Sequence, residues 1–232
     1  MVTRTFQSTL AAAAILAFSA ACGDGTAGSW QQEFGISNCK LLTTGRNQYL
    51  VLEPGFQLVL EGGGTKLQIT VLDETKVVDG VNTRVVEERE WKNGKLYEVS
   101  RNYFAICEQT KDVFYFGEDV DFYENDKVVK HDGSWLAGKG GNKAGLMMPG
   151  TPKVGMKYYQ EIAPDVAMDR AEIVSLDETC KTPAGAFSGC LKVKETSAIE
   201  FFAKEYKYHA PGIGLVRDED LQLVKQGFNK DK

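Results

Sequence analysis

The sequence contains few of the residues on which hydrolases and metal sites usually depend. Only two histidines occur, His131 and His209, and no Cys-x2-Cys pair accompanies them. The Gly-x-Ser-x-Gly and His-Glu-x-x-His motifs and the glycine-rich phosphate loop are also absent. The motifs therefore predict no catalytic residue, no metal site and no cofactor.

Charge of one sign is not concentrated anywhere in the chain. The net charge is −5, and no run of five like charges occurs. Because phosphate binding requires clustered Lys and Arg, we do not expect nucleic acid as a partner. Beyond the N-terminus, no apolar stretch is long enough to cross a bilayer.

The N-terminus has the pattern of an export signal over residues 1–21. Arg4 supplies a positive charge, residues 10–18 form a short apolar core, and small residues lead into Cys22. The position of Cys22 predicts acylation of its thiol in a bacterial lipoprotein, with ordinary cleavage after a Ser-x-Ala site as the alternative. Residues 22–46 would then be a tether and N-terminal segment. We expect a periplasmic or cell-surface protein, held to the membrane by a lipid anchor.

Four further cysteines suit an oxidising compartment, where an even count predicts two disulfides. Cys180 and Cys190 flank a Pro/Gly turn, so we expect them to face each other across a hairpin and to form a bond. Elimination then pairs Cys39 with Cys107. A zinc site is the competing interpretation, without supporting spacing.

Most segments from residue 47 onward alternate with period two rather than 3.6. Leu67, Ile69 and Val71 alternate with polar neighbours, and Asp79-Gly80 and Asn93-Gly94 mark hairpin turns. The pattern predicts an all-β fold: one large curved antiparallel sheet or open barrel, a meander of roughly ten or eleven strands with little helix. It would form a single domain over residues 47–228. Residues 136–153, rich in glycine and proline, are expected to be a long surface loop.

Two charges interrupt apolar faces of neighbouring strands. Glu118 follows Phe116 on one apolar face, and Arg101 precedes Tyr103 on another. A turn near residues 110–111 would place Arg101 and Glu118 diagonally on one side of the sheet, as an interior ion pair. A bulge at Gly117 that turns Glu118 outward is the alternative. A third interpretation makes Glu118, Arg101, Tyr103 and Phe116 a ligand-binding spot on an apolar concave surface.

Four stretches together resemble a group of bacterial exported proteins, many of them lipoproteins, whose function is uncharacterised. They are YFGEDVD at 115–121, MPGTPKVG at 148–155, TPAGAFSGCL at 182–191 and YHAPGIGLV at 208–216. The resemblance implies an exported β domain and carries no chemistry. By architecture alone, a curved sheet with an apolar concave side is similar to periplasmic lipid-handling half-barrels.

Three functional hypotheses follow from these features. The first is a non-catalytic β domain that binds a lipid, another apolar or amphiphilic small molecule, or a cell-envelope partner. The second is a hydrolase-type enzyme that uses Glu118 with His131 or Asp119. The third is a structural docking module, which would have a filled interior and an exposed apolar patch.

Overall fold

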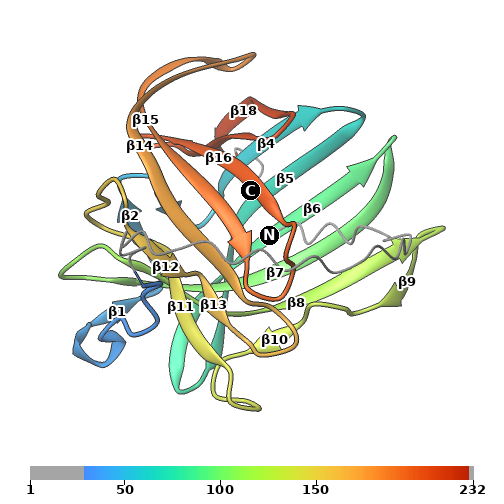
Figure 1. The fold of residues 1–232 in the computed structure, drawn as a ribbon. Coiled ribbons are helices and arrows are strands. Elements are labelled where there is room, and N and C mark those ends of the chain that lie inside the picture. Colours follow the sequence, from blue (N-terminus) through green and yellow to red (C-terminus); the bar gives the residue numbers. More distant parts are fainter. Residues whose placement is uncertain (1–28, 230–232) are drawn as a thin grey trace, which may run out of the picture.

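The computed structural model describes residues 29–229 and consists almost entirely of antiparallel strands (Figure 1). The only helical element in this range is the 3-10 turn η1, Ile36–Asn38. The prediction of an all-β fold with one large antiparallel sheet is confirmed. Within residues 29–229, no helix is long and apolar enough to cross a membrane. The predicted export signal and the acylated Cys22 lie outside the described residues.

The strands, in chain order, have the following bounds: β1 Leu41–Leu42, β2 Gly45–Asn47, β3 Leu50–Leu52, β4 Phe56–Gly62, β5 Thr65–Val78, β6 Val81–Lys92, β7 Lys95–Cys107, β8 Val113–Glu124, β9 Lys127–Lys130, β10 Trp135–Leu136, β11 Lys143–Met148, β12 Lys157–Tyr159, β13 Glu161–Ile162, β14 Asp169–Thr182, β15 Gly185–Ser197, β16 Lys204–Ala210, β17 Gly214–Asp218 and β18 Leu221–Phe228.

The main sheet is a nearly closed barrel. Thirteen strands follow one another in the order β12-β14-β15-β16-β17-β18-β4-β5-β6-β7-β8-β11-β13, compared with the expected ten or eleven. The short strands β1, β9 and β10 also pair with this sheet and bring it to 16 strands. One short segment brings the two edges together. The first half of residues 157–162 is β12 and pairs with β14, whereas the second half is β13 and pairs with β11.

Two short hairpin turns follow directly from the sequence. Asp79-Gly80 connects β5 to β6 and Asn93-Gly94 connects β6 to β7, with positive φ at all four residues. Such turns match the twist of the flanking strands and favour Asn or Asp followed by Gly. These two hairpin predictions are confirmed.

The glycine-rich segment 136–153 is not only a surface loop, as the sequence predicted. It contains β11, which pairs with β8 on one side and with β13 on the other. A Cβ at Gly145 would lie 2.3 Å from the carbonyl oxygen of Gln160, so only glycine allows this close approach of two backbones. A glycine that suggests a loop in the sequence therefore marks tight strand packing.

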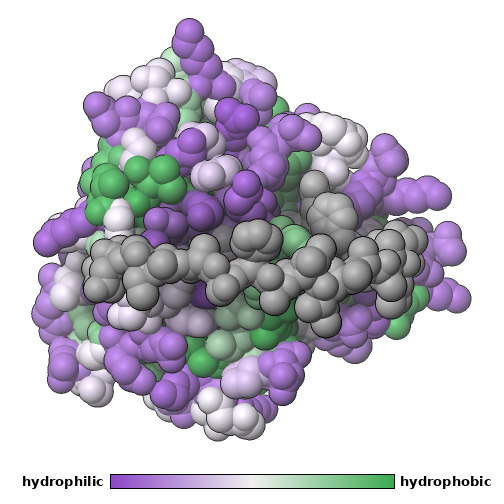
Figure 2. All heavy atoms as spheres, viewed as in Figure 1, coloured by the Kyte–Doolittle hydropathy of each residue, from purple (hydrophilic) through white to green (hydrophobic). Residues whose placement is uncertain are grey.

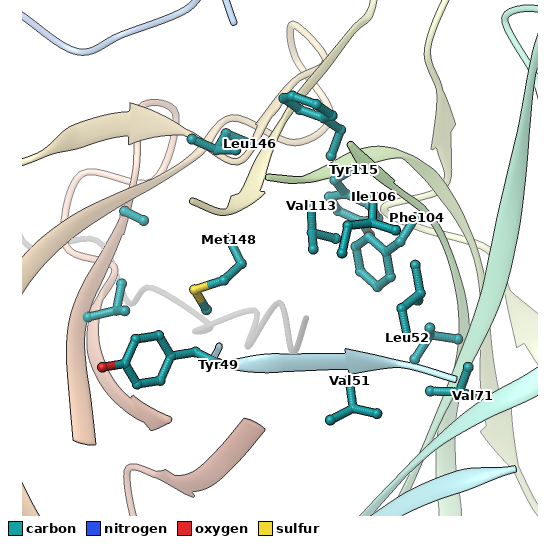
Figure 3. Packing of buried hydrophobic residues seen from close by; sticks show 14 of the residues in the cluster. Tyr49, Val51, Leu52, Val71, Phe104, Ile106, Val113, Tyr115, Leu146 and Met148 are labelled. Atoms are coloured by element: carbon teal, nitrogen blue, oxygen red, sulfur yellow. The ribbon is translucent and has the colours of Figure 1, made fainter. Parts of the chain in front are cut away.

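A separate hairpin, β2–β3, lies inside the barrel and fills one of its ends. Figure 3 shows Leu52 beside Phe104 and Val71 of the wall, and Met148 between Tyr49 and Val113. Tyr49, Val51 and Leu52 are all buried. Burying such side chains contributes about 1.5–3 kcal/mol each, so the hairpin adds to the stability of the hydrophobic core that the wall strands form.

Backbone groups from three of the four sequence motifs hold this hairpin. The Asn47 side-chain amide donates to the Pro149 carbonyl at 3.0 Å, and the Tyr49 hydroxyl donates to the Gly189 carbonyl at 3.2 Å. The Gly212 N–H donates to the Gln48 carbonyl at 2.8 Å. Motifs that carry no chemistry in the sequence thus have a structural role here.

The two ends of the barrel differ in character, because successive turns of an antiparallel sheet alternate between the ends. The turns at 79–80, 108–112 and 211–213 lie at the end that β2–β3 fills, which we call the plugged end. The turns at 63–64, 93–94 and 219–220 and the loop at 198–203 lie at the other end. We call this the acidic end, because carboxylates line the interior beside it.

The cysteine predictions divide into one success and one error. Cys39 and Cys107 form a disulfide that attaches the segment before β1 to the end of β7. Cys180 and Cys190 are free buried thiols. Register explains the error, since Cys180 pairs with Phe187 and Cys190 pairs with Glu178, so the two cysteines are not opposite each other.

Candidate functional site

A partly open cavity of about 90 Å³ lies between the β2–β3 hairpin and the wall of the barrel. One side of the cavity is mostly apolar and comes from β3 to β7, with Glu88 of β6 as its charged residue. Its lining includes Val51, Phe56, Leu58, Ile69 and Val71. Drug-sized ligands occupy cavities of roughly 300–1,000 Å³, so this cavity suits a much smaller molecule.

The opposite side of the cavity is charged and comes from β15, β16 and β17. Lys207 Nζ lies 2.7 Å from Glu195 Oε2 and 3.4 Å from Glu205 Oε1. Burial opposes the charge on Lys207, but the neighbouring carboxylates outweigh it and hold its pKa well above the usual range. Burial likewise opposes the charge on Glu195, yet Lys207 keeps the Glu195 pKa below its usual value. The pair is therefore ionised near neutral pH.

Two further titratable groups line the charged side. Burial raises the pKa of Asp218 to about 7, and Glu205 and Glu195 add to the rise against the opposing charge of Lys207. Its Oδ1 atom is buried and accepts no hydrogen bond within the described part of the chain. Burial lowers the pKa of His209 to about 4, so His209 is neutral at pH 7. Asp218 thus lines the cavity and has one buried carboxylate oxygen without a donor among the described residues.

More carboxylates lie inside the barrel beyond the cavity lining. Glu118 is 4% exposed, and Glu98 and Glu161 are also buried. Burial raises the pKa of Glu118 to about 8, with Glu98 and Glu88 contributing, and raises that of Glu98 to about 7. One oxygen of each of Glu98, Glu118 and Glu161 has no hydrogen-bond partner among the described residues. Acceptors without donors are the characteristic feature of this interior.

The predicted contact between Arg101 and Glu118 is wrong. Asn102 pairs with Glu118, and Arg101 pairs with Asp119 and with Glu87. Directly paired residues share a face, and Asn102 also pairs with Val86, which lines the cavity. Glu118 therefore points into the barrel and Arg101 points away from it. Arg101 instead forms ion pairs with Glu74 at 3.3 Å and Glu87 at 3.5 Å.

The irregularity that separates these two residues lies at Gly117. The register of β7 and β8 shifts between Asn102 and Phe104, next to Gly117, whose φ is +140°. A Cβ at Gly117 would lie 2.4 Å from the carbonyl oxygen of Trp135, so glycine is required there. The bulge at Gly117 was foreseen, but it leaves Glu118 buried rather than exposed.

The remaining predicted ligand-binding residues lie apart from the cavity. Tyr103 donates to Asp119 Oδ2 at 2.5 Å, and Lys76 donates to the Tyr103 hydroxyl at 3.1 Å. Phe116 is buried beside the bulge. The cavity lining contains neither Tyr103 nor Phe116, and neither Glu118 nor Arg101.

The residues of the hydrolase hypothesis are likewise not arranged as that hypothesis requires. Glu118 points inward, whereas Asp119 lies on the other face in an ion pair with Lys76 at 2.7 Å. His131 is exposed, and its Nδ1 lies 2.7 Å from Asp121 Oδ1. The three proposed catalytic groups are not brought together. Among residues 29–229, no group of three or more His, Cys, Asp and Glu is placed to hold a metal ion.

Sequence reasoning missed the charged side of the cavity. Leu191 and Val193 precede Glu195 at spacing two, which is the pattern that singled out Glu118. Lys207 and Asp218 lie directly opposite each other on β16 and β17. The first signal was available in the sequence, whereas the pairing depends on the register of the barrel.

Comparison of the chain with protein-family models, with curated proteins and with solved structures finds no match. Assignment of a function therefore depends on the cavity and on the surface of the barrel.

The opposite placement of Glu118 and Asp119 predicts opposite effects of pH on stability. The folded pKa of Glu118 is raised, so its contribution to stability is present below pH 4 and is lost as the pH rises through about 8. The amide in Glu118→Gln stays neutral at every pH, so the variant avoids the cost of a buried carboxylate. We expect its free energy of unfolding to exceed that of the unsubstituted chain by about 3 kcal/mol at pH 9 and to be nearly the same at pH 4. Urea unfolding at the two pH values measures both quantities.

Asp119→Asn is the matched variant. Burial opposes the charge on Asp119, but hydrogen bonds from Lys76 and Tyr103 lower its pKa, so its contribution is present above pH 4 and is lost in acid. Because the side chain is half exposed, the expected loss at pH 9 is below about 1 kcal/mol. A gain for Asp119→Asn at pH 9, or a loss for Glu118→Gln, would show that the two faces are assigned incorrectly.

Proposed function

We propose that this chain is an exported, non-catalytic binding protein, tethered to the cell envelope through a lipid on Cys22, whose barrel cavity accepts a small amphiphile. The observation that carries the proposal is the cavity itself, which has a mostly apolar wall on one side and a charged wall on the other. Ligand sites of this kind bury the apolar part of a molecule and orient it through a few polar groups.

The chemistry of the charged wall favours a ligand whose polar end donates hydrogen bonds. Lys207 already interacts with Glu195 and Glu205, whereas Asp218 Oδ1 is an unused acceptor. A buried acceptor without a donor costs about 1–3 kcal/mol, and a ligand ammonium group would remove that cost. A short alkylamine therefore fits both walls better than an alkanoate of the same length.

Calorimetric titration of the whole chain with n-butylamine, n-hexylamine and hexanoate tests the proposal. We expect the amines to bind and hexanoate to bind at least tenfold more weakly. The amine affinity should increase from pH 5 to pH 8, because the pKa of Asp218 is about 7 and the ionised form attracts the ammonium group. Three charged groups lie near the Asp218 carboxylate, namely Glu195, Glu205 and Lys207. We expect the change of amine affinity with pH to follow the ionisation of Asp218 alone.

Asp218→Asn, with the exposed Asp220→Asn as its matched control, locates the interaction. Only the first variant should lose amine affinity, by roughly tenfold or more, and should lose the pH dependence. Native mass spectrometry after gentle purification gives an independent result. Absence of a bound amphiphile, together with no amine binding, would rule out this function.

A further inference from the structure

The loop at 198–203, which connects β15 to β16 at the acidic end, carries two aromatic rings that the barrel does not cover. Phe201 is 94% exposed, Phe202 is 97% exposed, and the nearby Ile199 is 47% exposed. The two rings contact each other edge to face, with centroids 6.1 Å apart. Phenylalanine is usually buried, and an exposed apolar cluster often marks an interaction surface.

Trp30, near the start of the described chain, lies close to the base of this loop. The guanidinium of Arg170 stacks over the Trp30 ring at 4.6 Å, and its Nη2 donates to the Ser197 carbonyl at 3.0 Å. One side chain thus connects the start of the described chain to the last residue of β15. Trp30 lies eight positions after Cys22, and that length can extend over roughly 26 Å.

We propose that Ile199, Phe201 and Phe202 insert into the interfacial region of a lipid bilayer. Aromatic rings are favoured at the boundary between headgroups and acyl chains, and a loop with polar residues beside the rings enters only that far. Glu200 and Lys204 are exposed and would remain at headgroup level. A lipid on Cys22 and the loop would then contact the same surface, which turns the acidic end of the barrel toward the membrane.

The arrangement favours a bilayer over the other occupants of such a surface. Apart from the loop tip, Val166 in the adjacent turn is 42% exposed. These few side chains offer a protein partner or a second copy too little area for a stable interface, which usually buries about 1,200–2,000 Å². Most of the molecular face in Figure 2 is hydrophilic, with apolar atoms in a few separate places. Insertion depends on the rings alone and is independent of the proposed cavity ligand.

Fluorescence of Phe202→Trp in the full chain, with equimolar phosphatidylethanolamine and phosphatidylglycerol vesicles, tests the insertion. We expect a blue shift of the introduced indole, and quenching by lipids brominated near the headgroup, relative to the unsubstituted chain. Val77→Trp is the matched control. Val77 is 69% exposed near the turn of the plugged end, and its indole should stay unquenched.

A second measurement removes the contribution of a lipid anchor. In a Cys22→Ser chain, we expect Phe201→Ser with Phe202→Ser to reduce vesicle binding roughly 100-fold, because each ring transferred from water contributes about a factor of ten. An introduced indole that stays in water beside vesicles would overturn the proposal. A blue shift without vesicles that increases with protein concentration would also overturn it, by assigning the loop to contacts between copies of the chain.

Discussion

Lys207→Met is expected to lower the free energy of unfolding by about 3–5 kcal/mol at pH 7. Lys207 is buried, and its ammonium group lies 2.7 Å from Glu195 Oε2. Removing one partner of a buried ion pair leaves an uncompensated charge inside the protein, which is much more costly than losing a surface pair. The exposed Lys204→Met on the same strand is the matched control, with an expected change within about 0.5 kcal/mol.

The effect of pH identifies the cause of this loss. In the unsubstituted chain the pKa of Glu195 is lowered, so its contribution is present above about pH 4.5 and is lost in acid. Without Lys207, burial dominates and raises the Glu195 pKa, so the variant should become relatively more stable as the pH falls toward 5.

Adding Glu195→Gln to Lys207→Met tests the same explanation by double substitution. The amide removes the buried charge and can still accept a hydrogen bond from Gln160, which donates to Glu195 Oε1 at 2.8 Å. We expect the double variant to recover most of the stability that the single variant loses. Equal stability of the single and double variants in urea unfolding would contradict the ion-pair explanation.

Replacing both Cys39 and Cys107 with alanine is expected to lower the free energy of unfolding by about 4 kcal/mol. The disulfide joins residues 68 positions apart, so its removal frees a long loop in the unfolded chain. It also releases the segment before β1. The strand β1 itself pairs with the last two residues of β7. Denaturant unfolding under oxidising conditions measures the loss.

Reduction of the unsubstituted chain provides the control for this disulfide. Dithiothreitol should lower the unfolding midpoint of the unsubstituted chain to that of the double alanine variant and leave the variant unchanged. Because Cys180 and Cys190 are free thiols, they should contribute nothing to the difference. A further reductant effect on the variant would reveal a second bond and contradict the structure.

The site was only partly accessible from the sequence. Alternation correctly marked Glu118 as a charge among apolar neighbours, and the structure buries it. The partner was wrong, because a one-residue slip in register moves a side chain to the other face of the sheet. The bulge at Gly117 and the actual turn between β7 and β8 together place Arg101 opposite Asp119.

By itself, the sequence determined that this protein is built from antiparallel strands and where two of its tight hairpins lie. Those properties depend on local periodicity and on turn residues that tolerate positive φ. The pairing of Cys39 with Cys107 followed only by elimination from a Cys180–Cys190 bond that the structure does not contain, so the structure decided it. Only the tertiary structure decided the closure of the barrel by residues 157–162 and the filling of its plugged end by β2–β3. It also decided the meeting of Glu195 with Lys207. The physical reason is that period two assigns side chains to two faces of a strand, whereas long-range hydrogen bonding between strands decides which face becomes the interior.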